Sequence, residues 1–355
     1  MLPISVCIIA KNEEKNIKSC LEALKPYHFE IIIVDTGSTD RTKSIARRYT
    51  RHIYDYEWCN DFSAARNFSI EKASNDWILV VDCDEILQRF NEENVAAYME
   101  EHPTRMGMIT LMNEIPDPTG KMTYENSMME RLFHRDYYHY ESIIHEQVVP
   151  LHNQPYEAGI PIHVIVVHTG YNIPKEQLHA KNLRNIQLLE EAVRSEPNNA
   201  YHYFQLGRSH YILENYKESR EALDHALTLD LNPSVLYTKM LYTTYGNLNL
   251  AEGRTQDNIT FLETAQPIIG DYSDAIYLLA TSYFHEKNYT SAILNYIKAI
   301  NCPLHTNYAT KTYLSHYMLG VLYEGMGNRE LALSFFRNCP NHLDAAERIK
   351  RLSHS

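Results

Sequence analysis

No apolar run in the 355-residue sequence is long enough to cross a membrane. The run nearest the amino terminus, ISVCIIA at residues 4–10, is far shorter than the about 20 residues that a transmembrane helix takes. No basic segment precedes it and no small-residue cleavage site follows it. We therefore expect neither a transmembrane helix nor a signal peptide.

Positive charge is also scarce. The chain has 33 Lys and Arg against 45 Asp and Glu, a formal charge of -12. Proteins that follow a phosphate backbone need clustered cations, and the sequence has no stripe of Lys and Arg. The composition therefore argues against a nucleic-acid-binding protein. With 44% apolar residues, the chain can still fill a core in each of two domains.

Two kinds of diagnostic motif are missing. The six cysteines form no CxxC pair, and we predict that they are reduced side chains of a cytoplasmic protein. No GxGxxG follows the first apolar run, and no GxxxxGK(S/T) occurs anywhere. These absences exclude the dinucleotide-binding fingerprint and the P-loop, so a nucleotide site in this chain would need another construction.

Up to about residue 170, β-rich runs alternate with helical patterns. The apolar runs lie at residues 4–10, 30–35, 76–82, 107–112 and 161–168. Between the first two, Ile17, Cys20, Leu21 and Leu24 recur at helical spacing. After VDTGSTD we predict a second helix with Thr39 or Asp40 as its N-cap. This alternation is typical of βαβ units and predicts an α/β domain with a mostly parallel sheet.

From about residue 175 the pattern is helical only, and it repeats. Residues 200–233 form one copy, residues 273–303 align with it, and a third copy lies around residue 320. Small or aromatic residues recur in register at Leu206, Gly207, Tyr211, Tyr216 and Ala226, then at Ala280, Tyr289 and Ala299, and again at Gly320, Ala332 and Phe336. This pattern resembles the tetratricopeptide repeat, with residues 234–272 as a degenerate copy and 176–199 as a joining helix pair. Function in such a stack belongs to its concave groove.

The segment DWILVVDCDEIL at residues 76–87 places three acids at the end of an apolar run. On an extended strand Asp82 and Asp84 share one face, whereas Glu85 lies on the other. Two like charges so close raise each other's pKa or bind a cation, and a hard divalent ion with oxygen ligands is the usual partner. The alternative is a solvated strand end that leads into a helix, whose first turn favours acids.

Another carboxylate, Asp35, ends the run at residues 30–35 and leads into the small residues of VDTGSTD. In open α/β sheets, the carboxyl ends of the strands border the ligand crevice. A carboxylate at this place can accept a hydrogen bond from the imide N–H of a uracil ring. The alternative is ordinary turn chemistry, because Asp, Thr, Gly and Ser all form turns.

Four stretches together resemble the family 2 glycosyltransferases of the GT-A fold. They are ISVCIIAKNEEKNI, IIIVDTGSTD, NDFSAARN and VDCDE, and with ESIIHEQV, VVHTGYNIPKE and the helical repeats the likeness covers most of the chain. Among such enzymes, the order is most similar to the S-glycosyltransferases of glycosylated bacteriocins. The resemblance implies a UDP-sugar donor, Mn²⁺ or Mg²⁺ as cofactor, and DCDE as the DxD motif.

The resemblance also implies roles for individual residues. The nucleotide-sugar site would comprise Ala10, Asn12, Asp35, Arg66, Asp82, Asp84 and Glu85. Ala10 and Asn12 match the loop that borders the base, Asp35 the uracil-binding acid, Asp82 the ribose-binding acid and Asp84 the metal-binding acid. Arg66 would meet a phosphate or a sugar hydroxyl, with a helix-surface arginine as the alternative. Glu85 would either bind the sugar or cap the following helix.

The alternation of side chains along a strand separates the roles of two histidines near the end of the first domain. His163 and His168 are five positions apart, so they face opposite sides of a strand and cannot both bind one ion. His168 matches the histidine that completes the metal site in GT-A enzymes, and His163 is predicted to be packed or on the surface. Glu146 matches the acceptor-side acid and is the candidate general base, with His145 lining the site. The alternative is that HEQ is only a polar strand edge.

These inferences predict an inverting, metal-dependent transferase that moves a hexose, with glucose as the first candidate, from a UDP-sugar to a peptide or protein side chain. The sequence does not decide whether the acceptor atom is sulfur or oxygen. A thiol, with a pKa of about 8.5, needs less help from a base than the hydroxyl of Ser or Thr, so a candidate base does not distinguish them. The predicted domains are a catalytic domain at residues 1–172, joining helices at 173–199 and a repeat domain at 200–355. The repeats would hold the acceptor or form a homodimer. The alternatives are a transferase for cell-surface polysaccharide or glycolipid, and a non-catalytic tetratricopeptide scaffold.

Overall fold

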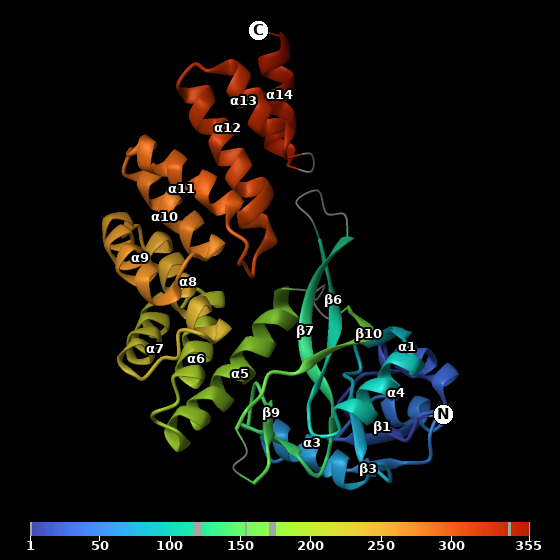
Figure 1. The fold of residues 1–355 in the computed structure, drawn as a ribbon. Helices are drawn as coiled ribbons and strands as arrows, with labels where there is room; N and C mark the ends of the chain where they lie inside the picture. Colours follow the sequence, from blue (N-terminus) through green and yellow to red (C-terminus); the bar gives the residue numbers. More distant parts are fainter. Residues whose placement is uncertain (1, 117–121, 153–154, 170–174, 340–341, 355) are drawn as a thin grey trace. The chain divides into compact units, whose positions relative to one another are not determined.

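A computed structural model describes residues 2–116, 122–152, 155–169, 175–339 and 342–354 (Figure 1). The described residues up to Thr169 form one compact unit, and those from Lys175 onward form another. The predicted domain boundary at residue 172 lies outside the described residues. No helix in the described ranges is both long and apolar enough to span a membrane.

The first unit contains an eight-stranded sheet in the order β3-β2-β1-β4-β7-β6-β10-β5. Its strands are β1 (Ile4–Ala10), β2 (Glu30–Asp35), β3 (Ile53–Asp55), β4 (Trp77–Val80), β5 (Glu85–Phe90), β6 (Gly107–Pro116), β7 (Met122–His134) and β10 (Ile160–His168). β3, β2, β1 and β4 are parallel neighbours, so the carboxyl ends of β2, β1 and β4 lie at one edge. β7 and β5 run against their neighbours. The α/β architecture with a mostly parallel sheet is confirmed in this unit.

Four α-helices, the short 3-10 helix η1 (Lys25–Tyr27) and a small second sheet complete the described part of the unit. The α-helices are α1 (Ile17–Leu24), α2 (Thr42–Ala46), α3 (Phe62–Glu71) and α4 (Glu92–Glu101), and β8 (Tyr138–Glu141) pairs with β9 (Gln147–Pro150). α2 begins at Thr42 with Arg41 as its N-cap, so the predicted cap at Thr39 or Asp40 is wrong. The helix starts later than predicted, although the Asp40 side chain still accepts a capping type of hydrogen bond from the Thr42 backbone N–H, and another from the Glu14 backbone N–H.

The segment after DCDE is a strand, so the alternative in which these acids lead into a helix is wrong. The acids of DCDE lead directly into β5, which pairs antiparallel with β10 at the edge of the sheet. In β5 the side chains of Glu85, Leu87 and Phe90 are buried. Leu87 and Phe90 join the main core, and this burial outweighs the preference of acids for a helix start.

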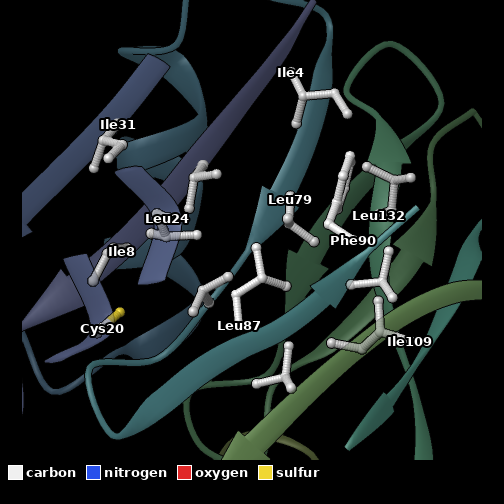
Figure 2. Packing of buried hydrophobic residues seen from close by; sticks show 14 of the residues in the cluster. Ile4, Ile8, Cys20, Leu24, Ile31, Leu79, Leu87, Phe90, Ile109 and Leu132 are labelled. Carbon is white, nitrogen blue, oxygen red and sulfur yellow. The ribbon is translucent and has the colours of Figure 1, made fainter. Parts of the chain in front are cut away.

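One of two core clusters in the described part of the first unit packs α1 against the sheet. Figure 2 shows Ile8 of β1, Cys20 and Leu24 of α1, Leu79 of β4 and Leu87 of β5 in one packed cluster. All five are 5% exposed or less. The helical spacing of Cys20 and Leu24 in the sequence therefore marks the face of α1 that covers the sheet.

The second unit is a series of helices. They are α5 (Lys175–Ser195), α6 (Ala200–Ile212), α7 (Tyr216–Thr228), α8 (Leu236–Ala251), α9 (Thr255–Ile269), α10 (Ser273–His285), α11 (Tyr289–Asn301), η2 (Thr310–Leu314), α12 (Ser315–Gly325), α13 (Arg329–Arg337) and α14 (Leu343–His354). The pairs α6–α7, α8–α9, α10–α11 and α12–α13 pack against each other as the repeat pattern predicts. Residues 175–195 form one helix, so the predicted joining helix pair is wrong.

Small residues in register let paired helices approach closely. A Cβ atom on Gly207 of α6 would lie 2.6 Å from the side chain of Leu223 on α7. A Cβ atom on Gly320 of α12 would lie 2.5 Å from the ring of Phe336 on α13. Neither distance is compatible with van der Waals packing, so these glycines serve helix packing.

His202 of α6 makes the stability of the second unit depend on pH. Its side chain is 1% exposed, and neither ring nitrogen has a hydrogen-bond partner among the described residues. Burial lowers the pKa of His202, and the Glu196 carboxylate 3.8 Å from Nδ1 offsets only part of this shift. Burial also lowers the pKa of His210 and of His342 in the same unit.

We predict that the free energy of unfolding falls as the pH drops below about 6.5, because the unfolded chain then binds protons that the folded histidines do not. His202→Leu should reduce the slope by up to about 1.4 kcal/mol per pH unit, the value for one proton. The slope is measured by denaturant unfolding at several values between about pH 5 and about pH 7.5, the range in which histidine changes its charge. The circular dichroism of the helices serves as the unfolding signal. An unchanged slope in the variant would contradict the prediction.

Candidate active site

The candidate site lies where the carboxyl ends of β2, β1 and β4 meet. Two loops there are tied together by hydrogen bonds. The Asn12 backbone N–H donates to Ser38 Oγ over 2.9 Å, and Asn12 Oδ1 accepts from the Thr39 backbone N–H over 2.8 Å. The Glu13 backbone N–H donates to Thr42 Oγ1 over 2.7 Å. Asn12 adopts a left-handed backbone with φ 58°, and its predicted role at the base border is thus accompanied by a structural one.

Asp35 is the last residue of β2 and is 2% exposed. Its Oδ1 accepts from the backbone N–H groups of Gly37 and Ser38, over 3.2 and 2.9 Å. Its Oδ2 is buried and has no hydrogen-bond partner among the described residues. Ala10 ends the neighbouring strand, where its carbonyl accepts from the Thr36 backbone N–H. A buried carboxylate oxygen without a donor is costly, so Oδ2 could accept a hydrogen bond from a donor group of a ligand.

The acids of DCDE do not share one environment. Asp82 accepts from Arg66 Nη2 at Oδ1 over 2.8 Å and from Arg131 Nη2 at Oδ2 over 3.0 Å. Burial raises the pKa of the Asp82 carboxyl, but the two guanidinium groups outweigh it and hold that pKa well below the usual range. The charge repulsion that the sequence suggested is therefore relieved by arginines at Asp82.

Glu85 is 2% exposed and lies beneath the turn. Its Oε1 accepts from Arg131 Nη2 over 3.1 Å, and its Oε2 accepts from the Asp82 backbone N–H over 2.8 Å. Burial raises the pKa of Glu85, and Arg131 offsets this only in part. Glu85 supports the turn from below. The predicted helix cap is wrong, because β5 starts at this residue.

Asp84 pairs with His168 at the end of β10. His168 Nε2 lies 3.2 Å from Asp84 Oδ2, and its Nδ1 lies 3.3 Å from Asn113 Oδ1 on β6. The Thr169 backbone N–H donates to the Asp84 carbonyl. Burial lowers the pKa of His168, but Asp84 outweighs it, so that pKa is raised. The two residues predicted as metal ligands are thus brought together, whereas His163 is exposed on the same strand.

The donor set at Asp84 and His168 is a carboxylate and an imidazole, which suits a divalent ion. Within the described ranges, no group of three His, Cys, Asp or Glu residues could hold an ion. The chain therefore offers two ligands, and an ion would need further oxygen ligands from a substrate or from water. Glu13 lies close enough that its pKa, raised mainly by burial, is raised further by Asp84.

Glu146 lies in the turn between β8 and β9 and pairs with Arg66. Arg66 Nε donates to Glu146 Oε1 over 2.6 Å, and the two side chains are 8% and 13% exposed. His145 precedes it with a left-handed φ of 53° and is half-buried. The ring of Tyr140 lies under the Arg66 guanidinium, 5.4 Å from Cζ to the ring centroid. Arg66 is therefore no surface arginine, since it joins the DCDE turn to the candidate base.

Sequence reasoning missed Arg131, Asn113 and Tyr140. The one available signal was the charge of Arg131 next to the buried Leu132 and Phe133, because a cation in a buried strand needs a paired acid. Asn113 and Tyr140 carried no signal of their own. Their importance arises from partners that are distant in sequence.

Comparisons with known proteins agree with this geometry. Residues 5–154 match the family described as Glycosyl transferase family 2, and residues 202–233 and 313–339 match a tetratricopeptide repeat. The chain is similar to the SPbeta prophage-derived glycosyltransferase SunS of Bacillus subtilis, with 32% identity over 63% of this chain and 52% of that protein. It is also similar to a TPR repeat-containing protein of Synechococcus elongatus, with 29% identity over 79% of this chain and 69% of that protein.

A shorter similarity is to the lipopolysaccharide core biosynthesis glycosyltransferase LpsC of Rhizobium meliloti, with 35% identity over 25% of this chain and 34% of that protein. The chain spans about half the length of the SunS protein. These similarities confirm a glycosyltransferase domain followed by tetratricopeptide repeats.

We predict that Arg66→Met lowers the free energy of unfolding of the first unit by about 3–5 kcal/mol, because the largely buried Glu146 loses its cation and Asp82 keeps only Arg131. The double variant Arg66→Met with Glu146→Gln should recover much of that loss. Both tryptophans, Trp58 and Trp77, lie in this unit, so denaturant unfolding followed by tryptophan fluorescence reports on it alone.

The matched control is Arg41→Met. Arg41 pairs with Glu14 over 3.1 Å, but its side chain is 79% exposed, so solvent screens the pair. The control should move the unfolding midpoint far less than Arg66→Met. Equal midpoints for the two variants would show that the buried pairs do not stabilise the unit.

Proposed function

We propose that this chain, which begins with a family 2 glycosyltransferase domain, transfers a hexose from a UDP-sugar to a side chain of a peptide or protein. Glucose is the first candidate sugar, and Cys, Ser and Thr are the candidate acceptors. The observation that carries the proposal is the meeting of Asp84 and His168, from segments 84 positions apart, at the carboxyl-end edge of the sheet. The unpartnered Oδ2 of Asp35 on the neighbouring strand supports it.

The proposed donor site has two parts, which lie at different strand ends. Asp35 would accept the imide N–H of the uracil ring, and this favours UDP over CDP because cytosine has an acceptor at that position. Asp84 and His168 would hold Mn²⁺ or Mg²⁺ together with oxygens of the diphosphate. The ion would offset the negative charge that develops on the departing UDP.

The acceptor side of the proposed site is Glu146. As a general base it would take the proton from the acceptor thiol or hydroxyl while the acceptor atom attacks the anomeric carbon, and UDP would leave from the opposite face with inversion. Arg66 donates to Glu146 and keeps its carboxylate oriented in a largely buried place. A thiol acceptor would depend on this base less than a hydroxyl acceptor.

The repeats favour a polypeptide as acceptor. A stack of helix pairs presents an extended concave surface, which suits a chain better than a small molecule. The similarity to LpsC favours a second candidate, a transferase that builds cell-surface glycan. That similarity covers only 25% of this chain, and the repeat matches at residues 202–233 and 313–339 point to the peptide acceptor.

We predict that Asp84→Asn removes the thermal stabilisation that UDP with Mn²⁺ gives the wild type and lowers transfer at least about 100-fold, since the ion loses its carboxylate ligand. The matched control is His163→Gln, an exposed histidine of the same strand, which should keep both properties. Differential scanning fluorimetry and release of UDP measure them. Full activity of Asp84→Asn in excess chelator would refute the metal site.

We also predict that the isolated repeats, residues 175–355, compete with the full chain for a peptide acceptor. Once circular dichroism shows that this fragment is folded, an excess of it should raise the apparent KM for the peptide several-fold while leaving hydrolysis of the UDP-sugar unchanged. A free thiol such as N-acetylcysteine serves as control acceptor, because it is too small to need the repeats. An unchanged KM for the peptide would mean that the repeats do not recruit the acceptor.

A further inference from the structure

Arg131 is a buried arginine of β7 that belongs to none of the predicted site residues. Its side chain is 8% exposed, and Nη2 donates to both Asp82 Oδ2 and Glu85 Oε1. Burial alone would lower the pKa of Arg131, but Glu85 and Asp82 outweigh it and raise that pKa, so the guanidinium stays charged. Arg131 is therefore a permanent cation under the DCDE turn.

The contacts of Arg131 continue in a chain of opposite charges. Asp82 binds Arg131 with one carboxylate oxygen and Arg66 with the other, and Arg66 in turn binds Glu146. Asp82 is further fixed because its backbone N–H donates to Glu85. The chain therefore runs from β7 through the β4–β5 turn and α3 to the turn between β8 and β9.

Each member of this chain is held in place by the next. Arg66 can aim Nε at Glu146 only while Nη2 is held by Asp82, since both nitrogens belong to one rigid guanidinium plane. Asp82 in turn keeps its carboxylate plane because Arg131 occupies the second oxygen. Without Arg131, the Asp82 carboxylate would keep only the donor at Oδ1, and the direction of Arg66 would be fixed less firmly.

We propose that Arg131 is a positioning residue that, through Asp82 and Arg66, sets the orientation of Glu146. The inference rests on the proposed function insofar as Glu146 acts on the acceptor. It also assigns Asp82 a role that the family resemblance did not imply, as the shared counter-ion of two arginines. Among the described residues, the hydrogen bonds of Arg131 go to Asp82 and Glu85 and not to Asp35 or Asp84, so we expect donor binding to depend on Arg131 less than transfer does.

The test compares three variants with the wild type. Arg131→Met with Glu85→Gln removes one charge of each sign, so that the fold keeps its charge balance while Asp82 loses the donor to Oδ2. We expect kcat for transfer to fall at least about tenfold, with the KM for the UDP-sugar within about threefold. Arg131→Lys, whose ammonium can replace Nη2, should retain most of the transfer rate. Arg89→Met removes an exposed arginine from the same sheet and should match the wild type.

A second measurement observes the orientation of Arg66 without any turnover. The Nε–H of Arg66 donates to Glu146, so its proton–nitrogen NMR signal reports on that bond, and Glu146→Gln assigns it. In Arg131→Met with Glu85→Gln, we expect this signal to shift or broaden, and in Arg131→Lys to return toward the wild-type position.

The outcomes separate the two proposals. A wild type that neither hydrolyses nor transfers any UDP-sugar would refute the proposed function, and the Arg66 signal would still test the relay. A folded double variant with wild-type kcat would overturn the positioning role. So would a loss confined to the KM for the donor, or an unchanged Arg66 signal.

Discussion

The arrangement of the candidate site depends on Asp82, whose carboxylate lies between two guanidinium groups. Placing three acids and two arginines in a largely dry region costs several kcal/mol per ion unless every charge is paired. The structure meets this requirement by joining Glu85, Arg131, Asp82, Arg66 and Glu146 in an alternating chain. Four separate segments of the first unit must therefore be correctly placed before any of these charges is satisfied.

Because every one of these charges must be paired, correct folding of the first unit and the arrangement of the candidate site depend on the same contacts. Apolar side chains at these positions would fill the space with less cost, because a buried ion pair seldom stabilises a fold more than good packing does. The charged side chains lie at the carboxyl ends of the strands, in the same turn as Asp84, which pairs with His168. A pairing network that stabilises little but fixes directions is well suited to hold the candidate base Glu146 and the candidate metal ligand Asp84 at set positions.

Local patterns in the sequence predicted the elements that depend on near neighbours. The strand ends at Ala10 and Asp35, the covered face of α1 and the repeated helix pairs follow from hydrophobic period and small residues, and all are present. The pair of Asp84 and His168 followed from family resemblance, since no local rule brings together residues 84 positions apart.

Distant pairing explains what the sequence could not predict. The sequence left a helix after DCDE as an alternative because the burial of β5 depends on β10, which pairs with it from far along the chain. Arg131 lies 49 positions from Asp82 and 46 from Glu85, so its role appears only when β7 is placed beside β4. The two loops at Asn12 and Thr39 are also joined across 27 positions. Because those bonds form during folding, the chain has already lost that conformational freedom before the proposed nucleotide would bind. Binding at this end of the candidate site would then cost little ordering entropy.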